Sequence, residues 1–150
     1  MLNLFSISEI TIGYKPEFKP SDRPKITTSN HAFDIIRNQW KDGDIEYRES
    51  FAVLLLNRAN HVLGINWISN GGLSGTVADP KMIFQAALKA NASSIILAHN
   101  HPSGNLKPSD MDISLTKKLV KAGQVLALPV IDHLIVGQDN YFSFADESLL

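Results

Sequence analysis

Two histidines, His99 and His101, stand one residue apart in the stretch HNHPSGNLKPSDMD (residues 99–112). The segment just before them, SSIILA, has the composition of a buried strand. Side chains at positions i and i+2 of an extended chain face the same way, so both imidazoles can turn toward one ion. Pro102 then ends the strand pairing. The spacing therefore predicts two imidazole ligands at the end of a strand.

A carboxylate follows these histidines at the start of a predicted helix. Ser109 stands where a helix cap belongs, which puts Asp112 in the first turn, near the positive end of the helix. Two histidines and one carboxylate are typical of a catalytic zinc site, whose open position holds a water with a pKa lowered to about 7. Taken singly, each histidine is more often a packed or surface residue, and Ser109 with Asp112 is a capping-box variant. The order of strand end, loop and helix start favours the metal site.

Other enzymes with paired histidines fit the chain less well. An amidohydrolase-type barrel needs about 250 residues, and this chain has 150. A zinc deaminase needs a cysteine pair, and the sequence has no cysteine. The helical HExxH signature of metalloproteases is absent. The letters HNH match the name of a nuclease class only in spelling, because that name refers to residues spread along a motif.

Length and composition indicate one globular domain with a sizeable core. Apolar residues make up 44% of the chain and charged residues 19%, and the formal net charge of -1 gives no basic field that would attract nucleic acid. The absence of cysteine excludes disulfides and thiolate zinc sites. No apolar run reaches the roughly 18 residues that a membrane helix needs, and the N-terminus lacks a signal-peptide pattern. We therefore expect a cytoplasmic protein with no membrane partner.

The order of predicted elements indicates an α/β or α+β class, with a mixed sheet and flanking helices. Residues 4–14 alternate well enough for a strand, and residues 15–25, with three prolines, are typical of a linker or surface strap. Ser29 is the expected cap of the helix that follows. We thus expect residues 1–44 to form an N-terminal strand, linker and helix, packed on or extending a domain of residues 45–150.

Strands and helices are mixed along the rest of the chain. Strands are expected at residues 49–57, 61–69 and 93–99 and in the segments VLALPV, DHLIVG and YFSF, and helices from Pro80 to about Ala92 and from Ser109 to a stop at Gly123. The first two strands should form a hairpin. The segment GGLSG (71–75) lacks the lysine and the spacing of phosphate-binding loops, so a tight turn beside the site is expected there.

The wider sequence resembles a known family. Histidine, any residue, histidine, proline, a short loop, then serine, two residues and aspartate is similar to the motif of the JAMM metalloproteases. The stretches ESFAVLLLNRANHVLG, GGLSGTVADPKMIFQAALKANASSIILAHNHPSGN and IDHLIVG…YFSFADESLL resemble the RadC-like branch of that superfamily, over roughly residues 45–150. The resemblance implies the compact α/β sandwich of the JAMM/MPN fold, which is of the cytidine-deaminase-like type.

The same resemblance implies a role for each residue of the site. His99, His101 and Asp112 would bind Zn²⁺. Ser109 would help to hold the oxyanion of a tetrahedral intermediate. Glu49 would act on the water bound to the metal. The RadC-like name also refers to DNA repair, a role that the metal motif itself does not explain.

Three groups of polar residues near the motif have simpler interpretations. Asn100, between the histidines, should point to the opposite face of the strand and be structural. His133 follows an aspartate at a strand start. A supporting role beside the metal is one interpretation, and a satisfied core pair with that aspartate is the favoured one. The basic helix face formed by Lys117, Lys118 and Lys121 should be solvated.

Three functions compete on this sequence. The favoured one is a zinc hydrolase of amide bonds, acting on a peptide or an isopeptide linkage in a protein substrate. The second is a DNA-repair-associated or nucleic-acid-associated accessory protein, which the net charge and the lack of the helix-hairpin-helix region of full-length RadC-like proteins disfavour. The third is a silent scaffold, which the complete ligand set disfavours. The substrate and the oligomeric state stay open, and the strand expected at residues 4–14 is a candidate for pairing with a second copy.

Overall fold

Five strands form one mixed sheet in the computed structural model, which describes residues 5–71 and 78–150. The elements are, in chain order, η1 (Pro20–Asp22), α1 (Ser29–Gln39), β1 (Ser50–Leu56), β2 (Val62–Asn70), α2 (Pro80–Lys89), β3 (Ser94–Asn100), α3 (Asp110–Val125), β4 (Val130–Val136) and β5 (Tyr141–Ser143). The strand order across the sheet is β2-β1-β3-β4-β5. Strands β3 and β4 run parallel, and the other neighbours are antiparallel. The predicted α/β class with a mixed sheet is confirmed.

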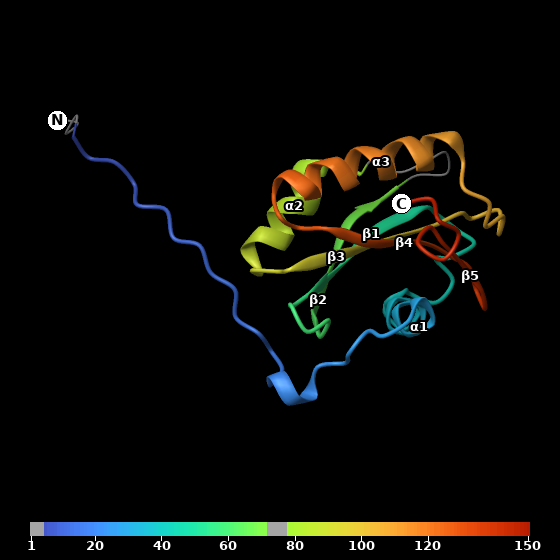
Figure 1. Cartoon of the computed structure of the whole chain (residues 1–150), viewed down its shortest axis with the longest axis horizontal. Coiled ribbons are helices and arrows are strands. Elements are labelled where there is room, and N and C mark those ends of the chain that lie inside the picture. The colour runs from blue at the N-terminus through green and yellow to red at the C-terminus, as the bar shows by residue number, and fades with distance from the viewer. Residues whose placement is uncertain (1–4, 72–77) are drawn as a thin grey trace.

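Helices cover both faces of this sheet, so the molecule has three layers (Figure 1). Helices α2 and α3 lie on one face, and α1 lies on the other. Val53 and Leu97 join the core on the α2 and α3 side, where they pack with Leu119. Leu54 and Ile96 join the core on the α1 side. Because β1 and β3 are buried on both faces, their sequences are almost continuous apolar runs.

Helix α1 completes the second core. Its cap is Thr28, one residue before the expected cap Ser29, because the Thr28 side chain accepts the hydrogen bond of the His31 amide at 3.1 Å. Its buried face consists of Ala32, Phe33 and Ile36. Among the described residues, no helix is both long and apolar enough to cross a bilayer.

The expected ends of α3 and β4 are wrong. Helix α3 continues past Gly123 to Val125, and the strand expected in VLALPV does not form, because β4 begins only at Val130. Gly123 lies inside the helix where the Leu128 carbonyl occupies the place that a Cβ would take. Leu128 is 3% exposed. Leu128 and Val130 are thus buried where the connection meets the core, whereas Val125 and Leu126 are exposed.

The N-terminal strand expected at residues 4–14 is also absent among the described residues 5–14. These residues are extended and lead away from the domain (Figure 1). Ile7, Ile10 and Ile12 are at least 79% exposed. Alternating apolar residues need a neighbouring strand to form a ladder. The segment meets the sheet at its end, where Tyr14 Oη donates to the Leu63 carbonyl at 2.5 Å.

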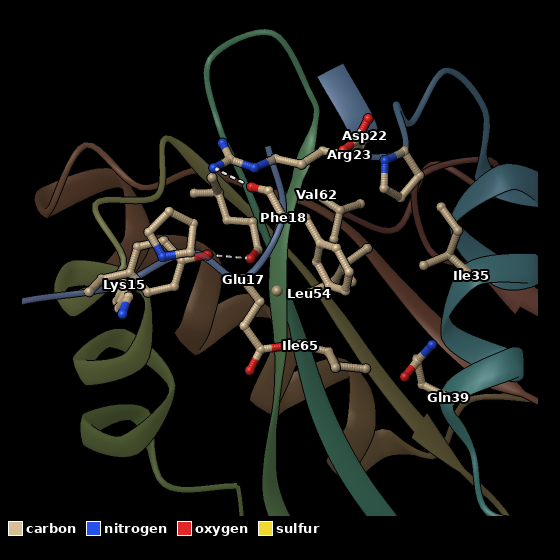
Figure 2. A pocket seen from close by; sticks show the side chains of 15 residues that line it. Lys15, Glu17, Phe18, Asp22, Arg23, Ile35, Gln39, Leu54, Val62 and Ile65 are labelled. Atoms are coloured by element: carbon tan, nitrogen blue, oxygen red, sulfur yellow. Dashed lines mark hydrogen bonds between the residues drawn. The ribbon is translucent and has the colours of Figure 1, made fainter. Parts of the chain in front are cut away.

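Residues 15–25, expected to form a linker or a surface strap, lie at the surface as a strap beside β2. Lys25 makes an isolated bridge to His61 beside β2. Figure 2 shows the cavity of about 470 Å³ that the strap shares with α1, β1 and β2, with the hydrogen bond from Arg23 Nη2 to the Phe18 carbonyl at its rim. The residues predicted to bind metal or act in catalysis do not line this cavity. Any chemistry of the motif therefore takes place elsewhere.

Candidate metal centre

Strand β3 and the residue after it carry the two histidines. The His99 side chain is 2% exposed, and that of His101 is 18% exposed. Phe51 of β1 is the sheet partner of His99 and stacks on its ring, with the ring centroids 5.9 Å apart. The Nε2 atoms of His99 and His101 lie 3.0 Å apart. The two imidazoles therefore meet at one point, as their spacing predicts.

Helix α3 supplies a carboxylate to the same point. Asp112 Oδ1 lies 3.2 Å from His99 Nε2, and its Oδ2 lies 3.1 Å from His101 Nε2. The Ser109 hydroxyl oxygen accepts from the Asp112 amide at 3.1 Å, while the Ser109 amide donates to Asp112 Oδ2 at 2.7 Å. This capping box fixes the carboxylate on the first turn of the helix. The capping box that begins α3 thus also orients the Asp112 carboxylate toward the two histidines.

The separations fit a tetrahedral metal ion. Two ligands at 2.0–2.1 Å from tetrahedral zinc lie about 3.3 Å apart, and the nitrogen and oxygen atoms here are 3.0 to 3.2 Å apart. His101 Nδ1 lies 2.6 Å from the Asn105 carbonyl oxygen, which can only accept, so Nδ1 carries a hydrogen. The Nε2 atom of His101 is thus left for an ion. Two imidazoles and one carboxylate are a donor set that suits zinc.

Glu49 brings a second carboxylate to the histidines. One of its oxygens and one ring nitrogen from each of His99 and His101 all lie within 4.8 Å of one another. Glu49 is half-buried directly before β1, and its carbonyl accepts from the Gly71 amide at 2.7 Å. Glu46 is exposed. The sheet therefore holds Glu49 beside the site, whereas Glu46 faces solvent.

Asn100 fixes the segment that carries Glu49. It is fully buried. Its Oδ1 accepts from the Ser50 amide at 2.8 Å, and its Nδ2 donates to the carbonyls of Ile45 at 2.6 Å and Arg48 at 2.9 Å. These bonds hold the chain on both sides of Glu49. The predicted structural role of Asn100 is confirmed, and that role orders the site.

His133 of β4 lies directly behind His99. It is fully buried, with Nε2 at 2.7 Å from His99 Nδ1 and Nδ1 at 2.7 Å from Thr116 Oγ1. Asp132 instead accepts from the His133 amide and from Ser143 Oγ, both at 2.7 Å. The favoured prediction of a core pair between the His133 ring and Asp132 is wrong. The ring supports His99.

Sequence reasoning missed Thr116. Its hydroxyl donates to the Asp112 carbonyl at 2.6 Å and contacts the His133 ring. Thr116 follows Asp112 by four residues, so both lie on the same face of α3. That spacing is the signal from which Thr116 is detectable, once Asp112 is taken as a candidate ligand.

The metal-free site has a definite charge pattern. Burial acts to raise the pKa of Asp112, but the hydrogen bond from His101, together with the adjoining imidazole of His99, outweighs it and holds this pKa far below its usual range. The hydrogen bond with Asp112 raises the pKa of His101, although burial opposes it. Burial lowers the pKa of His133 well below 6.5. A metal ion that binds here must therefore compete with a proton on His101.

A mixed sheet between helices, with paired histidines at the end of a central strand and a carboxylate at the start of the next helix, defines a JAB-type domain with a possible metal-binding site. The family model described as the RadC-like JAB domain matches residues 26–149. The chain belongs to this family. The match includes α1, in agreement with its place in the second core.

Curated relatives support the same family. The UPF0758 protein of Flavobacterium johnsoniae is 42% identical over 125 residues, which cover 83% of this chain and 53% of the relative. That of Symbiobacterium thermophilum is 35% identical over 144 residues, with coverage of 96% and 60%. That of Porphyromonas gingivalis is 49% identical over 129 residues, with coverage of 85% and 56%. The chain thus spans a little over half the length of these relatives.

Proposed function

We propose that this domain is a zinc-dependent hydrolase of peptide or isopeptide bonds. The observation that carries the proposal is the meeting of His99 Nε2, His101 Nε2 and the Asp112 carboxylate at separations of 3.0 to 3.2 Å. A second carboxylate, on Glu49, adjoins this group. Membership of the JAB family, whose members are generally hydrolytic, supports the same reaction class.

Each residue of the group has a distinct role in the proposal. His99, His101 and Asp112 hold the ion. A zinc ion held there would supply a Lewis acid that polarises the substrate carbonyl and makes water a stronger nucleophile. Glu49 accepts a proton from the attacking water and passes it to the leaving amine. The Ser109 oxygen accepts from the Asp112 amide, which leaves the hydroxyl hydrogen to donate to the oxyanion.

The burial of these residues gives the direction from which substrate approaches. His99 is closed off by the sheet, whereas His101 is partly open and Ser109 is exposed. A peptide therefore reaches the site along the side formed by His101 and the start of α3. A protein or peptide substrate fits an opening at the surface better than a deep pocket for a small molecule does.

Metal analysis and an amide-hydrolysis assay test the proposal. Protein purified without chelator should contain one zinc per chain and cleave members of a peptide library. The double variant His99→Ala, His101→Ala should lose both properties. The matched double variant His31→Ala, His61→Ala removes two histidines that lie outside the site and should keep both. One zinc per chain in the His99→Ala, His101→Ala variant would contradict the assignment of the site. A parent protein that binds zinc but cleaves no amide substrate would contradict the proposed reaction.

A further inference from the structure

We propose that Thr116 and His133 are positioning residues that fix the tautomer of His99, so that His99 Nε2 is left without a hydrogen on the side where the metal binds. The inference rests on the proposed zinc site for its purpose. Its evidence is a chain of three short hydrogen bonds that runs from α3 through β4 to β3.

The first step concerns the Thr116 hydroxyl, which has one hydrogen. Thr116 Oγ1 lies 2.6 Å from the Asp112 carbonyl oxygen and 2.7 Å from His133 Nδ1. The carbonyl oxygen can only accept, so the hydroxyl must donate to it. The hydroxyl oxygen then has only lone pairs to offer His133. The hydrogen between them therefore belongs to His133 Nδ1.

The second step concerns the other nitrogen of His133. The ring is fully buried and lies between the rings of Phe51 and Phe144, with centroid distances of 5.6 and 4.8 Å. An apolar surrounding of this kind favours the neutral ring, which carries one hydrogen only. With that hydrogen on Nδ1, His133 Nε2 is an acceptor. His99 Nδ1, at 2.7 Å, must then be the donor.

The third step concerns His99 itself. A neutral ring with its hydrogen on Nδ1 has a bare lone pair on Nε2. This is the atom that faces His101 Nε2 at 3.0 Å and Asp112 Oδ1 at 3.2 Å. Reversal of the chain would put a hydrogen on His99 Nε2 and block coordination. The direction of the hydrogen bonds thus decides whether His99 can serve as a ligand.

The arrangement differs from the usual support of a metal-binding histidine. Such a ring most often donates its second N–H to a carboxylate, a backbone carbonyl or a water, all of which can accept without further help. A neutral imidazole accepts through only one of its nitrogens, so its own tautomer must be fixed first. Here the Asp112 carbonyl does this through Thr116. Asp112 therefore supplies its side-chain carboxylate to the site, and its backbone carbonyl fixes, through Thr116, which nitrogen of His133 carries the hydrogen.

Nuclear magnetic resonance of zinc-free protein with ¹⁵N-labelled histidine tests the inference. Long-range ¹H–¹⁵N spectra at about pH 8, where histidine side chains are ordinarily neutral, report which nitrogen of each ring carries the hydrogen. In the parent and in Thr116→Ser, we expect His99 to carry it on Nδ1. In Thr116→Val, which keeps the shape but loses the hydroxyl, a measurable fraction should carry it on Nε2. Zinc affinity, measured by chelator competition, should fall about 10- to 100-fold in Thr116→Val and recover in Thr116→Ser.

Ser143→Ala is the matched control, because it also removes a buried hydroxyl hydrogen bond, to Asp132, without touching the His133 ring. It should lower stability and leave the His99 tautomer unchanged. A hydrogen on His99 Nε2 in the parent protein overturns the inference, whatever the variants do. A folded Thr116→Val with an unaltered His99 tautomer and a zinc affinity within twofold of the parent also overturns it. The expected tautomers in a parent that binds no zinc would support the hydrogen-bond chain and contradict the proposed function.

Discussion

Glu49 and Glu46 are three residues apart, and their surroundings separate their roles. Glu49 is half-buried beside the two histidines, whereas Glu46 is exposed. Glu49→Gln should keep zinc and fold but lose about 10²- to 10⁴-fold in hydrolysis rate, because a general base typically contributes that much. Glu46→Gln should hydrolyse at the parent rate. Zinc content, thermal unfolding and hydrolysis rate are measured for both variants. A slow Glu46→Gln beside a fully active Glu49→Gln would make Glu46 the general base.

The His101 and Asp112 pair should make the stability of the metal-free protein depend on pH. The pKa of His101 is raised from 6.5, so its contribution is complete below 6.5 and is lost as pH rises through the raised value. The pKa of Asp112 is lowered from 3.8, so its contribution is present above 3.8 and is lost as pH falls. The free energy of unfolding of the parent should therefore exceed that of His101→Gln most between about pH 4 and pH 6.5.

Urea unfolding with chelator present measures this difference across the pH range. A difference that stays constant from acid to alkaline pH would exclude the pair as its source. The stability added by zinc should depend on pH in the opposite direction, because zinc binding requires an unprotonated His101. The extra stability that zinc confers should thus grow as pH rises through the His101 pKa.

The residues proposed to coordinate zinc could be predicted from sequence more readily than the residues that support them. His99, His101 and Asp112 lie within one short motif, where local geometry alone brings them together. His133 joins His99 across 34 residues, and Thr116 joins His133 across 17. Such pairs depend on how β4 and α3 meet β3, which no local pattern contains. The aspartate next to His133 in sequence suggested a partner that the tertiary structure does not use.

At the scale of elements, replacing Gly123 in α3 by alanine should have the opposite effect on stability from the usual one. Glycine to alanine inside a helix ordinarily stabilises it by about 0.5–1 kcal/mol. Gly123→Ala should instead lower the free energy of unfolding by about 1–3 kcal/mol, because the Leu128 carbonyl occupies the place of the new methyl group. Gly64→Ala in β2 is the control, since nothing lies within 4 Å of its Cβ position. Urea unfolding compares both variants with the parent, and a stabilised Gly123→Ala would show that α3 can move away from Leu128.

The elements themselves followed from sequence where periodicity and burial agree. Strands β1 and β3 are apolar on both faces because helices cover both, and α2 begins at the aspartate and proline that predict a helix start. The same reasoning wrongly predicted a strand from Val125 to Val130, where the structure has the connection between α3 and β4. Leu128 and Val130 are buried there while Val125 and Leu126 are exposed, and composition alone does not separate such a connection from a strand.

At the scale of the molecule, we expect the segment of residues 5–14 to contribute little to the stability of the domain. Ile7, Ile10 and Ile12 are exposed, and the two cores lie elsewhere. The triple variant Ile7→Ser, Ile10→Ser, Ile12→Ser should therefore unfold within about 1 °C of the parent, because exposed substitutions change stability little. Ile36→Ala, in the core, should cost about 2–5 kcal/mol. Calorimetry of both measures the contrast, and a large loss in the triple variant would reveal packing of the segment in solution.

The distribution of charge gives an expectation for DNA. The net charge is -1, and Lys117, Lys118 and Lys121 form an exposed face on α3. Binding to duplex DNA at physiological salt should be no tighter than about 10⁻⁶ M and should weaken steeply as salt rises, since it would rest on phosphate contacts alone. Fluorescence anisotropy over a salt series measures it. A tight, sequence-selective complex would contradict this expectation and support DNA as a partner.

If the proposed site binds zinc, the parallel pairing of β3 with β4 has a consequence for folding. Leu97 lies opposite His133, and His99 lies opposite Ile135. A slip of β4 by one residue would turn the His133 ring to the α1 side of the sheet and leave His99 without its acceptor. Chains caught in such a slipped register would bind zinc weakly, so zinc present during refolding would draw them toward the native pairing by mass action. Zinc present during folding would thus favour the native register of β4 against β3.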